Sequence, residues 1–301
     1  MTTQTLRDPG RVPDGPLTPP GGSGGLVDVF RRRYLLKLLV QKELKARYSG
    51  SVLGLLWSYV KPAVRFSMYF VVMGLILNMD KRAENFAIHL FSGMVFVHYF
   101  SETFASGTRS IVRNKQLVQK MALPREMFPV AAMLVSAYHT IPQLMILTGG
   151  AILTGWSPDP MAFLAGAMGF TIIALFGMAL ALLFSAANVF FRDFQNIVET
   201  FAIFVTWSVP MIYPFSLVKN GRFGDTWVET VYLLNPLADA VLLVQRCFWL
   251  STTEDPTATL AQNFPDDLFL RGGIMIAVGL VFLGLAQLAF TRLEGKFAER
   301  L

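Results

Sequence analysis

An uncharged stretch, residues 161–191, constrains this chain more than any other feature of its sequence. It contains no Asp, Glu, Lys or Arg and ends at the pair Arg192-Asp193. A helix needs about 20 predominantly apolar residues to cross the hydrocarbon core of a bilayer. Residues 127–153 form a second uncharged run of sufficient length, although it includes two prolines. Both runs therefore predict membrane-spanning helices.

The composition agrees with a membrane protein. Of the 301 residues, 53% are hydrophobic and 15% are charged, and the mean hydropathy is +0.49. Soluble domains carry about 25% charged residues, so this composition excludes an ordinary soluble protein. The one cysteine, Cys247, allows no disulfide within the chain and therefore does not indicate a redox compartment.

The alternation of apolar and polar segments predicts an all-α integral membrane protein with six transmembrane helices within residues 57–291. The predicted spans are residues 57–77, 86–107, 127–153, 161–191, 197–218 and 272–291. A further segment, residues 231–250, is broken by Asn235-Pro236, and its apolar part is too short to cross a bilayer. We expect this segment to form an outer re-entrant hairpin before the last span.

The N-terminal part divides into two segments. Residues 1–25 are rich in Pro and Gly and poor in apolar groups, which predicts a disordered cytoplasmic tail. Residues 26–56 include a run from Arg31 to Arg47 with seven positive charges against one carboxylate, Glu43. Because leucine and valine side chains gather on one face of this run, we expect an amphipathic interface helix. Its role remains open between a lipid anchor, a docking surface and a positively charged flank.

The distribution of Lys and Arg predicts the orientation. With six spans and both ends inside, 20 of the 26 Lys and Arg residues lie in cytoplasmic segments and 6 lie outside. This asymmetry follows the positive-inside rule and predicts a multi-pass cell-membrane protein with both termini in the cytoplasm, including a short tail at residues 292–301. The topology accounts for the net charge of +6, so no nucleic-acid partner is expected.

The sequence holds no nucleotide-binding loop. Its only Gly-Lys pair, Gly295-Lys296, is followed by Phe297 and lacks the first glycine of the motif. Any ATP-driven work must therefore use a partner chain, and no catalytic residue and no cofactor are expected on this chain. A metal site is not expected, because His89 and His98 lie nine residues apart and so on opposite sides of a helix.

Four segments, taken with this layout, resemble the membrane subunit of type-2 ATP-binding-cassette exporters. They are KELKARYSGSVLGLLWSYVKP (42–62), VFFRDF (189–194), SVPMIYP (208–214) and LLNPLADAVLLVQR (233–246). They are most similar to the branch that exports O-antigen, teichoic acid or galactan, and the resemblance covers roughly residues 30–295. The Pro/Gly-rich tail and the pI near 9.5 are similar to those of the actinobacterial galactan exporter subunit, which makes galactan the favoured substrate.

The resemblance implies a transport subunit rather than an enzyme, which forms a homodimer with a channel between its copies and moves a lipid-linked polysaccharide. It also implies two cytosolic ATP-binding subunits, which would hold ATP and Mg²⁺. ATPase movements would reach this chain through its cytoplasmic segments. The residues expected to couple the two proteins are Arg31, Arg32, Lys37, Lys42, Arg47, Arg113, Lys120, Arg125, Arg192 and Asp193. Two other roles remain open for residues 109–125, a positive-inside loop and a site for the lipid's pyrophosphate. Arg192 is equally consistent with a helix terminus.

The second predicted span carries most of the residues expected in the substrate path. Those residues are Arg65, Phe96, Tyr99, Phe100, Glu102 and Phe104. The aromatic rings are candidates for a surface along which sugars stack, and the alternative is packing between helices or against lipid. Glu102 is a carboxylate deep within a span, so it either contacts the substrate or pairs with Arg109 or Arg113. Arg65 either faces substrate phosphate or anchors the helix at the headgroups.

Aromatic residues near the predicted outer hairpin are candidates for an exit gate. They are Tyr213, Phe215, Trp227 and Tyr232. The alternative is an interfacial aromatic belt.

The sequence therefore predicts the membrane subunit of an exporter for a polyprenyl-pyrophosphate-linked polysaccharide, surrounded by membrane lipids. One alternative is a type-2 exporter of drugs or small lipids. Another is a membrane-embedded glycan-transferring enzyme, for which Asp266-Asp267 is an outward pair of adjacent acids that such a site would use. A scaffold without transport activity is a third.

Overall fold

The computed structural model describes residues 24–121, 123–221, 224 and 226–301. Nearly all of the predicted disordered tail, residues 1–25, lies outside them. The α-helices are α1 (Leu26–Arg31), α2 (Arg33–Tyr48), α3 (Trp57–Tyr69), α4 (Phe86–Arg113), α5 (Lys115–Lys120), α6 (Met127–Leu153), α7 (Pro160–Phe190), α8 (Phe194–Trp207), α9 (Ser216–Lys219), α10 (Trp227–Tyr232), α11 (Pro236–Phe248), α12 (Pro256–Asn263), α13 (Leu268–Glu294) and α14 (Phe297–Arg300). A π-helical segment, Phe70–Ile76, continues α3. The described part of the chain contains no β-strand.

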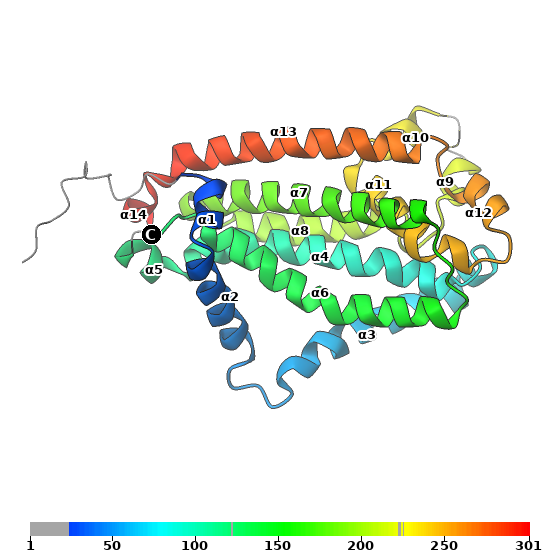
Figure 1. The fold of residues 1–301 in the computed structure, drawn as a ribbon, viewed down its shortest axis with the longest axis horizontal. Coiled ribbons are helices and arrows are strands. Elements are labelled where there is room, and N and C mark those ends of the chain that lie inside the picture. The colour runs from blue at the N-terminus through cyan, green and yellow to red at the C-terminus, as the bar shows by residue number, and fades with distance from the viewer. Residues whose placement is uncertain (1–23, 122, 222–223, 225) are drawn as a thin grey trace, which may run out of the picture.

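Helix α7 is the centre of the bundle, and α4, α11 and α13 pack along it (Figure 1). Its start follows from local chemistry, because the carboxylate of Asp159 accepts a 2.7 Å hydrogen bond from the backbone N–H of Ala162 and a proline follows at the first helical position. Small residues allow the close approach of neighbouring helices. A Cβ at Gly169 would lie 2.8 Å from the carbonyl oxygen of Ala240 on α11.

Four helices of the described residues are long and apolar enough to cross a membrane by length and composition. They are Trp57–Ile76, Met127–Leu153, Pro160–Phe190 and Leu268–Glu294. The other two predicted spans do not reach this standard. Helix α4 starts at the predicted residue but continues to Arg113 and carries several charged side chains. Helix α8 has 14 residues and ends at Trp207, because Pro210 and Pro214 follow.

The re-entrant course predicted for residues 231–250 stays a prediction. Helices α10 and α11 occupy this region, and every residue from Leu237 to Gln245 of α11 is buried. Asn235 caps α11 through a 3.0 Å hydrogen bond from the N–H of Leu237. The segment is too short to cross a bilayer, and here it packs against α7, α4 and α13.

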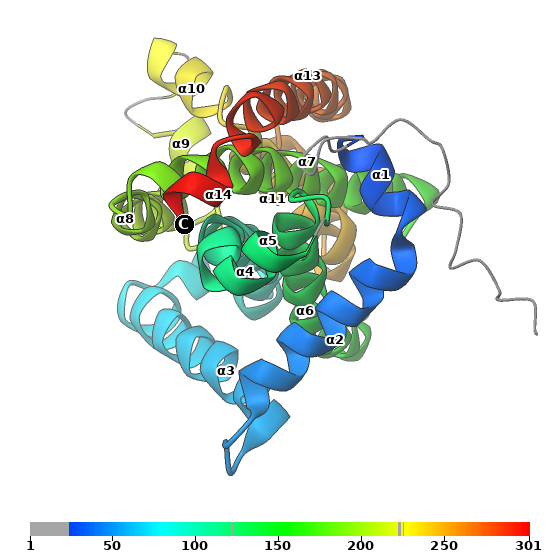
Figure 2. The ribbon, with the colours of Figure 1, turned by 90° about the vertical axis from the view of Figure 1, so that its left-hand side faces the viewer.

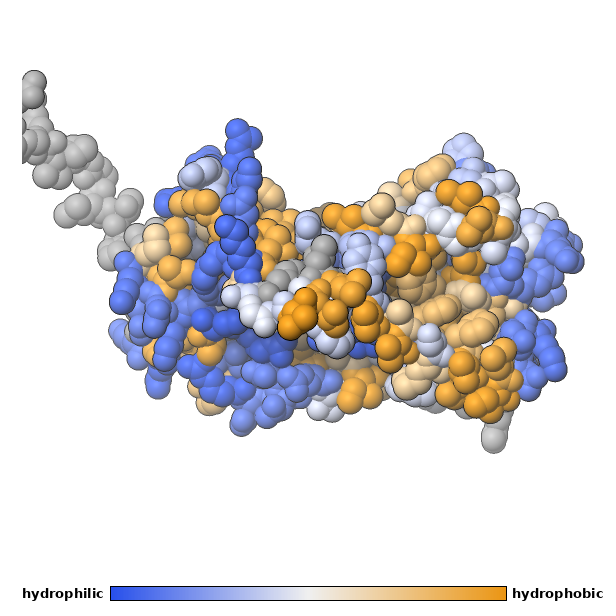
Figure 3. All heavy atoms as spheres, turned by 90° about the horizontal axis from the view of Figure 1, so that it is seen from below, coloured by the Kyte–Doolittle hydropathy of each residue, from blue (hydrophilic) through white to orange (hydrophobic). Residues whose placement is uncertain are grey.

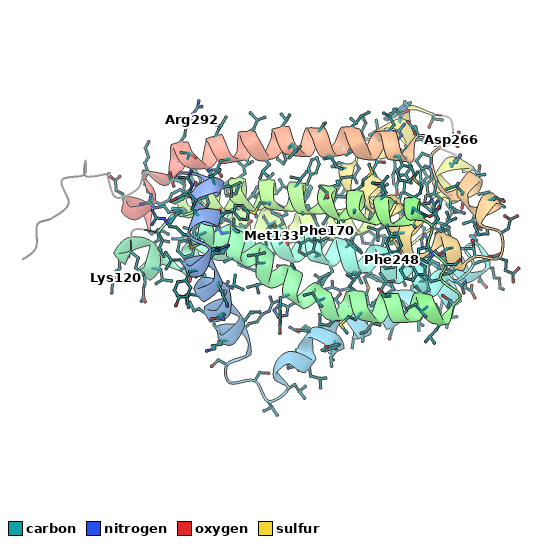
Figure 4. All side chains as sticks on the ribbon, viewed as in Figure 1. Lys120, Met133, Phe170, Phe248, Asp266 and Arg292 are labelled. Atoms are coloured by element: carbon teal, nitrogen blue, oxygen red, sulfur yellow. The ribbon has the colours of Figure 1, made fainter. Side chains whose placement is uncertain are left out.

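The predicted interface helix at residues 26–56 consists of two helices, α1 and α2, followed by residues 49–53 outside any helix. Figure 2 shows α1, α2, α5 and α14 gathered at one end of the bundle with the C-terminus. We call this the basic end. Figure 4 places Lys120 and Arg292 there and Asp266 at the opposite end. Hydrophilic residues gather at both ends, with hydrophobic surface between them (Figure 3), as expected for a membrane protein.

Glu43 fastens α2 to the bundle. Its side chain is 10% exposed, and it receives hydrogen bonds from Arg113 and from Asn114 Nδ2, the latter at 3.0 Å. Lys42 donates to Oδ1 of the same asparagine. These contacts fix the amphipathic helix to the basic end of α4.

Candidate functional site

A polar groove runs along α4 between α2, α3, α6 and α8. It consists of three adjoining cavities of about 360, 360 and 480 Å³, and Glu102 lies in the wall of each. Arg65 and His98 line the largest cavity and one of the smaller two. Arg47 lines the largest cavity and the other smaller one. We refer to the three cavities together as the Glu102 groove.

The spacing along α4 explains why its polar side chains face this groove. His98, Glu102, Ser106, Arg109 and Arg113 recur at intervals of three or four residues and all line its walls. Residues at this spacing share one face of a helix. The polar residues of α4 therefore form one stripe from the middle of the helix to its basic end.

Arg47 supplies the partner of Glu102. Its Nη2 lies 2.7 Å from Oε1 of Glu102 and donates a hydrogen bond, so the last turn of α2 is joined to the middle of α4. The sequence led us to expect Arg109 or Arg113 as the partner. Arg109 instead lies 3.3 Å from Glu199 on α8, and Arg113 pairs with Glu43. Since these arginines lie about 10 and 16 Å further along α4, carboxylates on other helices are closer to them.

Helix α3 is attached to the bundle across the groove by polar contacts. Arg65 Nη1 lies 3.0 Å from His98 Nδ1, and because a guanidinium only donates, the ring nitrogen accepts. Ser58 Oγ lies 3.2 Å from His139 Nδ1 on α6. Lys61 is held over the ring of Trp57 at 5.9 Å. Contacts with neighbouring side chains therefore fix the positions of Ser58, Lys61 and Arg65, which line the groove from α3.

The walls of the groove carry an excess of positive charge. The charged residues that line it are Lys42, Arg47, Lys61, Arg65, Arg109 and Arg113, against Glu43, Glu102 and Glu199. Four of the six cations, Lys42, Arg47, Arg109 and Arg113, are paired with these three carboxylates. The remaining charge suits an anion, and arginine in particular suits the bidentate binding of phosphate.

The aromatic residues predicted for a sugar-stacking surface lie elsewhere. Phe96, Tyr99, Phe100 and Phe104 are 1–5% exposed. Tyr99 stacks on Phe170 of α7 at 5.6 Å, and Phe104 meets Phe184 of α7 edge-on at 4.9 Å. Figure 4 shows Phe170 in the middle of the bundle. Within one subunit these four rings pack between helices and do not face the groove, because their spacing places them on another side of α4.

Other aromatic residues line the groove, and the sequence analysis did not select them. Tyr69 lies one turn after Arg65 on α3, Trp57 opens α3, and Trp207 ends α8. The four-residue spacing from Arg65 to Tyr69 places both on one face of α3, so the sequence could have predicted Tyr69 in the groove. It could not have predicted Trp207 there, because the position of Trp207 depends on how α8 packs beside α4.

The structure brings together three of the four predicted gate residues. The hydroxyl oxygens of Tyr213 and Tyr232 lie 3.3 Å apart, and the ring of Phe215 stacks on that of Tyr232 at 6.0 Å. Trp227 lies on α10 and is 75% exposed.

The predicted coupling residues fall into four groups. Arg31 on α1, Arg32 between α1 and α2, Lys37 on α2 and Lys120 on α5 are exposed. Lys42, Arg47 and Arg113 line the groove. Arg125 is 8% exposed and lies 5.7 Å above the ring of Phe297, while donating to the backbone oxygen of Glu294. Arg192 and Asp193 are exposed in the short connection between α7 and α8.

Among the described residues, no group of three His, Cys, Asp or Glu side chains is arranged to hold a metal ion.

Comparisons with known proteins place this arrangement among transport proteins. A family model described as the ABC-2 type transporter matches residues 34–248. An O-antigen export system permease protein RfbA of Klebsiella pneumoniae is 25% identical over 269 residues, which are 88% of this chain and 94% of that protein. The protein of the same description from Myxococcus xanthus is 26% identical over 276 residues, covering 90% and 97%.

Proposed function

Because the chain belongs to the ABC-2 type transporter family, we propose that it is the membrane subunit of an ATP-driven exporter for a polyprenyl-pyrophosphate-linked polysaccharide. The substrate would move from the cytoplasm to the outer side of the membrane. The relatives named for O-antigen export match along nearly their whole length, which supports a lipid-linked glycan as the transported class.

The observation that carries the proposal is the excess of cations in the Glu102 groove. Arg47, Lys61 and Arg65 line its largest cavity, with Glu102 as the one carboxylate among the lining residues. A pyrophosphate carries several negative charges and many acceptor oxygens, so such walls favour it over a neutral drug or a zwitterionic lipid. This chemistry favours a glycolipid exporter over the drug-exporter alternative.

The proposed topology has six spans, with α4 as the second and α8–α9 within the fifth, and with the basic end in the cytoplasm. Lys and Arg concentrated on α1, α2 and α5 support this orientation. Two copies of the chain would enclose the channel, since one copy has too few spans to surround a glycan. Two ATP-binding subunits would dock at the basic end and hold ATP and Mg²⁺. The Arg192-Asp193 connection is a further candidate contact.

Galactan remains our proposal for the polymer, on the resemblance of the Pro/Gly-rich tail and the basic pI. Chemical analysis of the accumulated polymer tests this point separately from transport itself.

The test of transport is depletion of the chain in its native cell, followed by isolation of lipid-linked material from the inner side of the membrane. We expect a polyprenyl-pyrophosphate glycan to accumulate and an ATP-binding protein to co-purify with the tagged chain. Depletion without such accumulation, or purification without an ATPase, would overturn the proposal. An enzyme that transfers glycans would instead leave unextended acceptor.

A further inference from the structure

A second cleft lies beside the Glu102 groove, between α3, α4 and α6. It has a volume of about 230 Å³, and its walls are almost wholly apolar, with Phe66, Phe91, Ile146 and Leu147 among them. We call it the apolar cleft. Figure 2 shows α3 standing off from α4 and α6, and α3 is the least buried of the candidate spans. The cleft is therefore open to a ligand that arrives from the membrane.

The apolar cleft and the Glu102 groove are continuous. Pro62 on α3 and Gln143 on α6 line both. Along α6 the lining changes from His139 in the groove, through the shared glutamine, to Leu147 in the cleft. His139 and Leu147 are eight positions apart, which is about 12 Å along the helix. One elongated site thus changes from cationic to apolar within the length of two helical turns.

The direction of this change has a physical meaning. Helix α6 starts at the basic end, so the cationic part lies nearer that end and the apolar part lies further along the helix, towards its other end at Leu153 (Figure 1). An inner-leaflet lipid has the same order, with its charged headgroup at the cytoplasmic surface and its hydrocarbon towards the membrane centre. The site therefore has the polarity of a lipid that faces the cytoplasm.

We propose that one subunit by itself binds the polyprenyl phosphate carrier, with the phosphate between Arg47, Lys61 and Arg65 and the first part of the tail in the apolar cleft. This inference rests on the proposed function and extends it, because it places the lipid inside a subunit. The Arg65–His98 and Ser58–His139 contacts, which hold α3 to α4 and α6, then border the bound lipid.

Two observations favour the carrier over an ordinary phospholipid. The three cations face one carboxylate, which suits a headgroup with more than the single charge of a phosphodiester. The cleft volume of about 230 Å³ lies below the 300–1,000 Å³ of sites for drug-sized molecules. It therefore holds a short length of one hydrocarbon chain and not two chains side by side.

Two adjacent glycines on α6 provide a matched test. A Cβ at Gly150, which lines the cleft, would lie 3.3 Å from Cδ1 of Ile88, whereas a Cβ at Gly149 would meet no heavy atom within 4 Å. The full chain carrying Gly150→Leu or Gly149→Leu is purified into nanodiscs of phosphatidylcholine doped with undecaprenyl phosphate or with phosphatidylglycerol. Lipid that stays bound after detergent washing is measured by mass spectrometry.

We expect Gly150→Leu to reduce retained undecaprenyl phosphate by about tenfold, a change that corresponds to filling part of the cleft, and Gly149→Leu to retain as much as the wild type. Ala63→Phe fills the cleft from the exposed side of α3 and gives the same loss if Gly150→Leu does not fold. Two further variants test the phosphate site. Arg65→Gln lowers retention of undecaprenyl phosphate, and Lys81→Gln, in the loop before α4, does not.

Equal retention by wild type, Gly150→Leu and Ala63→Phe overturns the inference, and so does equal retention of phosphatidylglycerol by the wild type. Neither result touches the proposed function, which fails if depletion of the chain leaves no glycolipid on the inner side or if no ATPase co-purifies with it. If the chain retains undecaprenyl phosphate in the cleft but exports no glycan, the inferred lipid site holds and the proposed function fails.

Discussion

Arg47 and Glu102 are 55 residues apart in the sequence, and their side chains meet at 2.7 Å where the end of α2 reaches the middle of α4. This contact closes one side of the Glu102 groove. It also joins the amphipathic N-terminal helix to the helix that carries the polar stripe, so a force on α2 has a direct route to the groove.

Exchange of the two charges tests this contact. Arg47→Glu and Glu102→Arg each place like charges together, and we expect each to destabilise the purified chain by about 1 kcal/mol, because the side chains are 42% and 22% exposed and such pairs are worth little more. The double exchange should recover most of the loss. Thermal unfolding in detergent gives the coupling energy. Strictly additive losses would show that the two side chains do not interact.

Glu43 should matter more, since it is 10% exposed and receives two hydrogen bonds. We expect Glu43→Gln to lower the free energy of unfolding by about 1–3 kcal/mol, because the arginine and asparagine that contact it lose their charged partner. Freed α2 should also be cut faster by trypsin after Lys45 and Arg47. The exposed Glu299→Gln is the control, and equal cleavage of both variants would contradict the expectation.

Close packing of α4 on α7 depends on Gly107, where a Cβ would lie 2.5 Å from Cβ of Ala181. Gly107→Val forces the two helices apart, and we expect a loss of about 1–3 kcal/mol or more. Gly149→Val has open space and should fold normally. The yield of monodisperse protein on size-exclusion chromatography, with the midpoint of thermal unfolding, compares the two variants.

Some of these features could be predicted from the sequence and others could not. Helix α6 has the predicted bounds, residues 127–153, because an uncharged run gives both its type and its ends. Helix α4 extends past its prediction because Arg109 and Arg113 find carboxylates on other helices, and hydropathy does not register such partners. The stripe of polar residues on α4 follows from helical spacing, but the Arg47–Glu102 contact depends on how α2 packs.

The aromatic residues of α4 show the same limit. A four-residue spacing places Phe96, Phe100 and Phe104 on one face, but it does not tell whether that face meets a neighbouring helix or an open path. The short segment at α11 was similarly ambiguous, because a dozen apolar residues fit an interfacial hairpin and a buried helix equally well.

The loop before α7 provides a pH-dependent contribution. Arg246 Nη2 lies 2.9 Å from Asp159 Oδ2. Desolvation raises the pKa of this carboxyl, but hydrogen bonds from Arg246 and the Ala162 amide outweigh it, so the pKa lies below its ordinary value. The stabilisation is therefore complete above the unfolded-state pKa of about 3.9 and is lost as the pH falls through the lower folded-state pKa.

Two substitutions separate the charge of Asp159 from its role as a helix cap. Asp159→Asn keeps an acceptor for the Ala162 amide, so its melting temperature should fall below that of the wild type near neutral pH and converge with it as the pH falls through the lowered folded-state pKa of Asp159. Asp159→Ala also removes the cap and should cost about 1 kcal/mol more at every pH. A constant difference between wild type and Asp159→Asn across the range would contradict the assignment of the effect to ionisation.

The final prediction concerns energy coupling. Arg32, Lys37 and Lys42 lie on the N-terminal helices at the basic end, and reversal of all three to Glu should leave insertion intact, because the later basic segments still set the topology. An ATP-binding partner that docks on these helices would then hydrolyse ATP without moving substrate. We expect export to fall by about tenfold or more while ATPase activity in the purified complex persists. Neutral exchange of the exposed Lys296 to Gln controls for loss of charge at the same end. Disappearance of the reversed variant from the membrane would instead assign these residues to topology alone, and an unchanged ratio of export to hydrolysis would remove them from the coupling path.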